Sequence, residues 1–473
     1  LGGTCLNHGC IPTKILCTVA DILEQSRRYE SLGIKSKALE GDWAKVKERV
    51  FNVIESQRQG LDTYYETMEG LDLYRGTAQF TDPKTLAVKD ETGEIIATLK
   101  APTILIATGS RSRIPDMPGM DEIDYLTAES FFDRATYPQK PPQSLLLVGG
   151  GPIGVEFAHI FEAFGTKVTI VQRNVRLVPK SDEDVSAAVE RAFASRNIHS
   201  LFNQETLSVK KGGDGVLLEV RDKASDEIQT LTAETIFFSA GVVSANGLLH
   251  AERSGIKLDE RDWIPTNEYL ETNVPGIFAI GDANGRQQLR HKANYEAEIL
   301  WHNHYVATKP EEWRAADYRY APYVTYTSPQ TAQVGLTEAQ LKERGIPYEV
   351  SILGYSETAK GTALGYKDPD EAFVKVLLEP ETEKILGVHI VGAEASILIQ
   401  GYVYLLEAGK DRAPFLGEVI SDEGKKAREA EPEHYQPNQA AAVTHAMTAH
   451  PSLGEVSAWA FSWNRWDQGK GTP

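Results

Sequence analysis

Two cysteines near the start of the 473-residue chain are the side chains best suited to redox chemistry. Cys5 and Cys10 lie five positions apart, with Gly9 between them. A regular helix would separate their Cα atoms by ~8.6 Å, whereas a disulfide needs roughly 4.4–6.8 Å. A bond between them therefore requires a break in the helix, which a glycine can supply. Two small buried cysteines in a glycine-rich turn would give the same pattern.

The sequence after Cys10 predicts the helix that must hold this pair. Pro12 suits the first turn of a helix that begins just after Cys10. Apolar residues then recur at helical spacing, namely Ile15, Leu16, Val19, Ile22 and Leu23. A thiol at the start of a helix is acidified by the helix dipole, which favours the reactive thiolate.

Local signals predict three further elements. Asp42 is expected to cap a helix whose apolar face includes Trp43 and Val50. A strand is expected over 71–80, and Thr337 and Gln340 are expected to begin a helix as a capping box.

A glycine-rich turn in residues 149–154 points to a second chemical function, nucleotide binding. The sequence Gly149-Gly150-Gly151-Pro152-Ile153-Gly154 follows a buried strand at 145–148 and opens a helix that ends near Gly165. A further strand is expected at 168–171. In this context the G-x-G-x-x-G pattern indicates that a pyrophosphate approaches the helix N-terminus. The alternative is that these glycines only allow close packing.

The end of the second strand bears on the choice between NAD and NADP. An acidic residue is expected there to hold the ribose hydroxyls of NAD, but the position is Gln172, followed by Arg173 and then Arg176. Arginines would suit the extra phosphate of NADP(H). Equally, both arginines could be ordinary surface charges, so either nicotinamide remains open.

Two more positions could do chemistry. Asp282 ends a short apolar strand, where an aspartate can cap the following helix. His450 precedes a proline and lies five positions before Glu455, which could orient the imidazole of a general base. A lone histidine near a C-terminus can also be purely structural.

Composition limits the partners of this protein. A net charge of −18 argues against nucleic acid and anionic membrane surfaces. Three cysteines are too few for a secreted disulfide scaffold, so we expect a cytoplasmic protein with a catalytic pair. No apolar run reaches membrane-spanning length, and no metal site is predicted.

Residues 1–14, residues 272–282, the His291-Lys292-Ala293 step and the His450-Pro451 step with Glu455 together resemble the class I pyridine nucleotide–disulfide oxidoreductases. The dihydrolipoamide dehydrogenase branch is most similar. The resemblance implies an α/β fold with two Rossmann-like nucleotide-binding domains, for FAD and NAD(P), and an α+β dimerisation domain. The expected boundaries are 1–138 and 256–320 for the FAD domain, 139–255 for the NAD(P) domain and 321–473 for the dimerisation domain, with a charged insertion near 411–439.

The resemblance also implies a role for each site residue. Cys5 and Cys10 would form the redox-active disulfide, with Cys5 exchanging with substrate and Cys10 lying against the flavin. Lys14 would lie near the reactive flavin nitrogen and pair with Glu156. His450 and Glu455 would form the acid–base pair, presented to the cysteines of the partner subunit. The remaining FAD-side residues would be Gly76, Thr108, Gly109, Ser110, Gly281, Asp282 and Arg290, and the NAD(P)-side residues Gly149, Gly151, Pro152, Ile153, Gly154, Gln172, Arg173 and Gly241.

The implied activity is that of a flavin-dependent dithiol/disulfide oxidoreductase, a homodimer acting on a small or lipoyl-domain dithiol. The resemblance allows a 2-oxoacid dehydrogenase or glycine cleavage complex as its partner. One alternative is an NADPH-dependent reductase of a low-molecular-weight, glutathione-type disulfide. A second is an inactive or fragmentary homologue, because the strand, glycine turn and helix that bind the FAD pyrophosphate in relatives do not precede Cys5 in this sequence.

Overall fold

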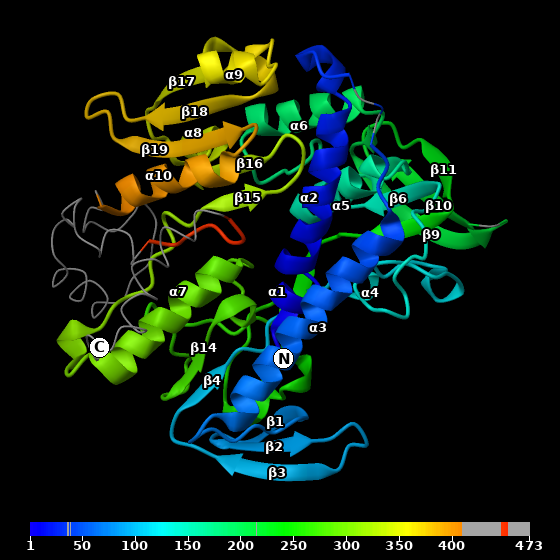
Figure 1. The fold of residues 1–473 in the computed structure, drawn as a ribbon. Helices are drawn as coiled ribbons and strands as arrows, with labels where there is room; N and C mark the ends of the chain where they lie inside the picture. Colours follow the sequence, from blue (N-terminus) through cyan, green and yellow to red (C-terminus); the bar gives the residue numbers. More distant parts are fainter. Residues whose placement is uncertain (36, 38, 214, 409–445, 453–473) are drawn as a thin grey trace.

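Figure 1 shows the computed structural model of the protein, and the description covers residues 1–35, 37, 39–213, 215–408 and 446–452. Two long helices, α2 (Cys10–Ser26) and α3 (Trp43–Thr67), run through the middle of the molecule. The buried face of α2 includes Leu16 and Leu23, as the helical spacing predicts. Asp42 caps α3, also as predicted, because its side chain accepts a hydrogen bond from the backbone N–H of Lys45.

A four-stranded parallel sheet in the order β12-β6-β7-β8 surrounds the glycine turn. Its strands are β6 (Ser144–Val148), β7 (Lys167–Val171), β8 (His199–Leu201) and β12 (Thr235–Phe238). Their apolar runs are typical of strands covered on both faces. Helix α5 (Pro152–Ala163) follows β6, and α6 (Glu183–Ser195) follows β7. An antiparallel sheet of β9 (Gln204–Gly212), β10 (Gly215–Asp222) and β11 (Ile228–Ala233) shares a core with β6.

A second parallel pair, β4 (Ile104–Ile106) and β14 (Ile277–Ala279), joins segments far apart in the sequence. The short helix η5 (Gly281–Asn284) and then α7 (Arg290–Trp301) follow β14. Smaller elements complete this half: α1 (Gly3–Asn7), the antiparallel sheet β1 (Thr77–Asp82), β2 (Thr85–Lys89) and β3 (Ile95–Lys100), the pair β5 (Ser110–Ser112) and β13 (Val242–Ser244), and α4 (Ala128–Phe131).

The C-terminal unit is a five-stranded antiparallel sheet in the order β15-β16-β19-β18-β17. Its elements are β15 (Tyr323–Thr325), β16 (Thr331–Gly335), α8 (Glu338–Arg344), β17 (Glu349–Gly354), α9 (Ala359–Ala363), β18 (Phe373–Leu378), β19 (Ile385–Val391) and α10 (Ala395–Ala408). The apolar side of α10 packs on β16 and β19. Thr337 and Gln340 form the predicted capping box of α8.

A buried lysine ties this sheet to the start of α6. The Lys375 ammonium on β18 lies 2.8 Å from an Asp182 oxygen and 2.5 Å from an Asp184 oxygen, and it also contacts Glu338. Burial disfavours the charge, but these hydrogen bonds raise the pKa of Lys375. The three carboxylates are close enough together to ligate a metal ion. The lysine ammonium already supplies the positive charge among them.

The predicted α/β fold class is confirmed, and the predicted strands and helices are present with ends shifted by a few residues. The main difference is the strand expected over 71–80, which begins only at Thr77. The charged insertion near 411–439 lies outside the described residues. Within the described part of the chain, the helices are too short or too polar to cross a membrane.

Candidate active site

The cysteine pair lies where two helices meet at a break. Helix α1 ends at Asn7, and α2 begins at Cys10. Between them Gly9 adopts φ −126° and ψ −113°, which is not helical. This break supplies the distortion that the spacing of the cysteines requires. Both cysteines are thiols in the structure, as in the reduced form of such a pair.

The side chain of His450 lies against this pair. The Cys5 Sγ is 3.2 Å from the His450 Nε2, and the ligating atoms of Cys5, Cys10 and His450 all lie within 4.8 Å of one another. The hydrogen bond from Cys5 lowers the pKa of Cys10 to about 5; burial opposes this shift, while His450 and Lys14 add to it. Cys17, two turns beyond Cys10 on α2, behaves differently, because burial raises the pKa of its thiol. The structure therefore favours a thiolate at Cys10 and not at Cys17.

In this structure of a single chain His450 lies beside the cysteines of its own chain, whereas the resemblance expects the histidine of the partner subunit there. Contacts on both sides of His450 hold the segment. Tyr326 donates a hydrogen bond to the Pro451 carbonyl, and the Ala449 N–H donates to the Gln400 side chain of α10 at 3.1 Å. Tyr326 and α10 of the same chain therefore hold this segment. Which subunit's histidine serves each site of a dimer stays a prediction. Glu455, the expected orienting carboxylate, lies outside the described residues.

The expected pairing of Lys14 with Glu156 is confirmed. The Lys14 ammonium is 2.6 Å from one Glu156 oxygen, and the other oxygen accepts the Tyr326 N–H at 2.8 Å. The ammonium also lies 4.5 Å from the centre of the Tyr326 ring. Burial disfavours the charge, yet the Glu156 carboxylate raises the pKa of Lys14. One turn of α2 beyond Cys10, the site therefore carries a fixed positive charge.

The carboxyl ends of β4 and β14 bring the expected FAD-side residues together. Ser110 donates a hydrogen bond to Asp282 at 2.5 Å, and burial raises the pKa of Asp282. Thr108 donates to the side chain of Asn246 at 2.6 Å. Gly109, between Thr108 and Ser110 in the sequence, adopts φ +73°. The structure also shows two candidates away from this cluster. A Cβ at Gly76 would lie 2.4 Å from a β2 carbonyl, so this glycine permits close packing, and Arg290 is exposed at the start of α7.

Sequence reasoning missed the ion pair that holds the Asp282 turn. Lys292 and Glu296, both fully buried on α7, lie 3.0 Å apart. Lys292 donates to the Gly281 carbonyl at 2.8 Å and to Asn284 at 2.6 Å, while Glu296 accepts from the Gly281 N–H and from Asn284, each at 2.7 Å. The signal in the sequence was a Lys–Glu pair four positions apart, which is usually a surface pair.

The glycines of the nucleotide turn have separable roles. Gly149 adopts φ +108°, which favours glycine. A Cβ at Gly154 would lie 2.0 Å from the Gly149 carbonyl oxygen, so this position permits close packing of α5. A Cβ at Gly151 would meet no atom within 4 Å. Pro152 is the first residue of α5, and Ile153 is exposed.

Gln172 turns toward this loop and away from solvent. Its side-chain oxygen accepts from the Gly150 N–H at 3.2 Å, and its amide donates to the Arg176 carbonyl at 3.0 Å. Arg176 pairs with Glu183 at 2.6 Å, whereas Arg173 is exposed. Gly241, the last NAD(P)-side candidate, is exposed directly before β13.

The comparisons with known proteins match one family along most of the chain. Residues 1–297 match the family described as pyridine nucleotide-disulphide oxidoreductase, and residues 321–420 match the dimerisation domain of that family. Mycothione reductase from Mycobacterium tuberculosis is 32% identical over 413 residues, which is 86% of each chain. Dihydrolipoyl dehydrogenase from Rhizobium etli is 31% identical over 85% of this chain and 84% of its own. Mercuric reductase from Staphylococcus aureus is 29% identical over 86% of this chain and 71% of its own.

The solved structures show the same fold. The copper(II) complex of the HOCl-induced flavoprotein disulfide reductase RclA from Escherichia coli superposes with a TM-score of 0.74. The match covers 98% of this chain and 91% of that one at 22% sequence identity. The two proteins therefore share their architecture.

This chain belongs to the pyridine nucleotide-disulphide oxidoreductase family. Its cofactors are those of the family, FAD and NAD(P). The residues fit both groups: the open space at Gly151 leaves room for a phosphate at the start of α5, and Asp282 presents a carboxylate beside Ser110. The matched dimerisation domain supports a homodimer.

Proposed function

We propose that this protein is a flavin-dependent dithiol/disulfide oxidoreductase of the dihydrolipoamide dehydrogenase type. The observation that supports this most directly is the gathering of Cys5, Cys10 and His450 within 4.8 Å of one another. The buried Lys14–Glu156 pair beside them adds a fixed charge where the resemblance expects the flavin. The relatives named dihydrolipoyl dehydrogenase support the same assignment.

In the proposed reaction His450 removes a proton from one thiol of a substrate dithiol. The resulting thiolate attacks the Cys5 sulfur of the oxidised pair, the Cys5–Cys10 bond breaks, and Cys10 leaves as a thiolate. The second substrate thiol then displaces Cys5, so the substrate leaves as a disulfide and two electrons remain on the cysteines. The lowered pKa of Cys10, about 5, makes it a good leaving group.

Bound FAD supplies a ring that accepts two electrons from a thiolate and passes a hydride to a nicotinamide. The chain contributes the surroundings of that ring. Lys14 is held by Glu156 at 2.6 Å, and Asp282 accepts from Ser110. The buried Lys292–Glu296 pair on α7 holds the residues on either side of Asp282, Gly281 and Asn284. We propose that these groups orient the cofactor against Cys10.

We also propose a preference for NADP(H) over NAD(H). Gln172 replaces the usual carboxylate, and its side chain is committed to the Gly150 N–H and the Arg176 carbonyl. Arg173 is exposed beside it and could pair with a ribose phosphate. Arg173→Ala is expected to raise the KM for NADPH while leaving the KM for NADH unchanged.

A second candidate is an NADPH-driven reductase of a low-molecular-weight disulfide. Gln172 and Arg173 favour it, because an NADPH preference suits the reductive direction, and the similarity to mycothione reductase agrees. In that direction the same steps run backwards, with Cys5 attacking the substrate disulfide.

Steady-state turnover separates these candidates. The flavin-loaded protein should be assayed with dihydrolipoamide and NAD(P)+, and with lipoamide, glutathione disulfide and mycothiol disulfide against NADPH and NADH. We expect turnover with a dithiol/disulfide couple that is lost in both Cys5→Ser and Cys10→Ser. Full turnover in Cys10→Ser would refute the proposal.

A further inference from the structure

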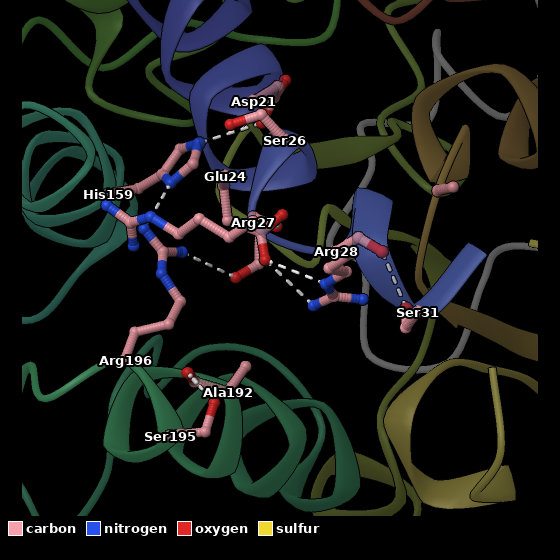
Figure 2. Close-up of polar contacts among 12 residues, drawn as sticks. Asp21, Glu24, Ser26, Arg27, Arg28, Ser31, His159, Ala192, Ser195 and Arg196 are labelled. Carbon is pink, nitrogen blue, oxygen red and sulfur yellow. Dashed lines mark hydrogen bonds and ion pairs between the residues drawn. The ribbon is translucent and has the colours of Figure 1, made fainter. Parts of the chain in front are cut away.

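A buried histidine on α5 links the nucleotide-binding sheet to the helix that carries Cys10. His159 has no exposed surface. Its Nε2 lies 2.9 Å from an Asp21 oxygen on α2, and its Nδ1 lies 2.9 Å from Nη2 of Arg196, at the end of α6 (Figure 2). The proposed chemistry does not use this imidazole, and the sequence pattern did not single it out.

The partners of His159 determine which of its nitrogens carries the proton. An arginine can only donate hydrogen bonds, so Nδ1 must accept from Arg196. Nε2 therefore carries the proton and donates to Asp21. Burial and the Arg196 charge lower the pKa of His159, while Asp21 and Glu24 act in the opposite direction. The imidazole is thus a neutral bridge with a fixed donor side and a fixed acceptor side.

The same bridge is held from several directions. Arg196 donates to Glu162 of α5 through Nε at 3.0 Å and to the Ser328 carbonyl at 3.3 Å. Glu162 in turn accepts from Arg27 of α2 at 2.6 Å. The Arg196 side chain is 8% exposed and that of Glu162 12%, so water competes little for these bonds. Two helices, the end of a third and a loop of the C-terminal unit therefore meet at one polar cluster.

This cluster forms a second connection between α2 and α5, and the Lys14–Glu156 pair forms the first. Asp21 lies two turns beyond Lys14 on α2, and His159 lies one turn beyond Glu156 on α5. Two separated contacts between two helices fix both their translation and their rotation. Because α5 begins at the open phosphate position of Gly151, its seating on α2 sets where a nicotinamide lies relative to Lys14 and Cys10.

We propose that His159 is a positioning residue for electron transfer from the nicotinamide: its hydrogen bond to Asp21 seats α5 on the redox helix. This inference rests on the proposed oxidoreductase function. It predicts that loss of the hydrogen bond to Asp21 slows electron transfer from the nicotinamide more than loss of the hydrogen bond to Arg196. A misplacement of about 1 Å between reacting groups costs roughly 100-fold in rate.

Three substitutions of His159 test which of these two hydrogen bonds has the larger effect on electron transfer. The Gln amide reaches the Nε2 position and can still donate to Asp21. The Asn amide reaches only the Nδ1 position, so it can accept from Arg196 but cannot donate to Asp21. Leu can form neither hydrogen bond. His199→Gln, at an exposed histidine on β8, serves as the control. Each flavin-loaded protein is mixed anaerobically with NADPH or NADH and reduction of the flavin and cysteine pair is followed in a single turnover. Thiol–disulfide exchange of the reduced pair is measured separately, and hydrogen–deuterium exchange reports on α2 and α5.

We expect His159→Leu and His159→Asn to slow reduction by the nicotinamide roughly 10- to 100-fold. His159→Gln and the control should stay within about twofold of the wild type. Thiol–disulfide exchange should be unchanged in all variants, and hydrogen–deuterium exchange should rise where α5 faces α2 in the two slow variants. Equal slowing of both half-reactions, or wild-type reduction in His159→Leu, would overturn the positioning role. Failure of the wild type to accept electrons from either nicotinamide would instead refute the proposed function.

Discussion

The environment of Cys10 makes a direct prediction about His450. The Cys5 hydrogen bond and His450 both lower the pKa of Cys10, from an ordinary value of 9.0 to about 5. Removing the imidazole in His450→Ala should therefore raise that pKa. The change leaves the Cys5 contact and the Lys14 charge in place, so it isolates the contribution of His450 to the pKa of Cys10.

The size of the shift follows from the geometry. An opposite charge within about 4–6 Å shifts a pKa by roughly 1–3 units, so the pKa of Cys10 should rise from about 5 to roughly 6–8. At pH 6 the thiolate fraction would then fall from about 90% to between about 1% and 50%. The stability of the reduced protein changes in the matching sense. A depressed thiol pKa stabilises the folded state above pH 9, and this contribution is lost as the pH falls toward 5. In His450→Ala the pKa of Cys10 is closer to its ordinary value, so the pH range over which the contribution is lost is narrower.

Alkylation of the reduced protein by iodoacetamide measures this pKa. The rate is followed from pH 4 to pH 10, and mass spectrometry locates the label on Cys10. The wild type should show an inflection near pH 5, and His450→Ala one that is higher by one unit or more. His250→Ala, at a histidine whose side chain is 38% exposed and lies away from the cysteine pair, paired with Glu252, is the control. An unchanged inflection in His450→Ala would contradict the reasoning.

Three further predictions concern the subunit that supplies the histidine, the glycine turn and the buried lysine. If the arrangement of the single chain holds in the dimer, hybrid dimers of a Cys10→Ser chain with a His450→Ala chain should remain inactive; recovered activity would mean that the histidine of the partner subunit serves each site, as the family resemblance implies. Gly151→Val should fold normally but bind NAD(P)H at least about tenfold more weakly, whereas Gly154→Val should fail to fold stably because of the nearby carbonyl; equal binding by titration would contradict this. Lys375→Met should lower the free energy of unfolding by about 3–5 kcal/mol, measured in urea, because three carboxylates lose their cation; a change under about 1 kcal/mol would argue that water already screens the cluster.

The sequence was informative wherever a local rule applies. Asp42 and Thr337 were predicted as helix caps, and the glycine turn was placed between a strand and a helix, because these patterns span only a few residues. The Lys14–Glu156 contact, across 142 positions, was expected only through the family resemblance. Local spacing alone carries no such long-range information.

The remaining features depend on tertiary contacts. His159 meets Asp21 across 138 positions, and nothing around either residue indicates this. The Lys292–Glu296 pair looks like a surface pair until the turn it holds is known. The placement of residues 446–452 beside Tyr326 and Gln400 is likewise a tertiary contact, and the sequence of that segment does not indicate it.

The central claim is that electrons from a nicotinamide reach the cysteine pair. The most direct measurement is to reduce the flavin-loaded protein anaerobically with NAD(P)H, quench with a thiol-alkylating reagent and map the label. The account predicts two new labelled thiols for each chain, at Cys5 and Cys10, with Cys17 unchanged. Consumption of NAD(P)H without new thiols, or with label elsewhere, would contradict it.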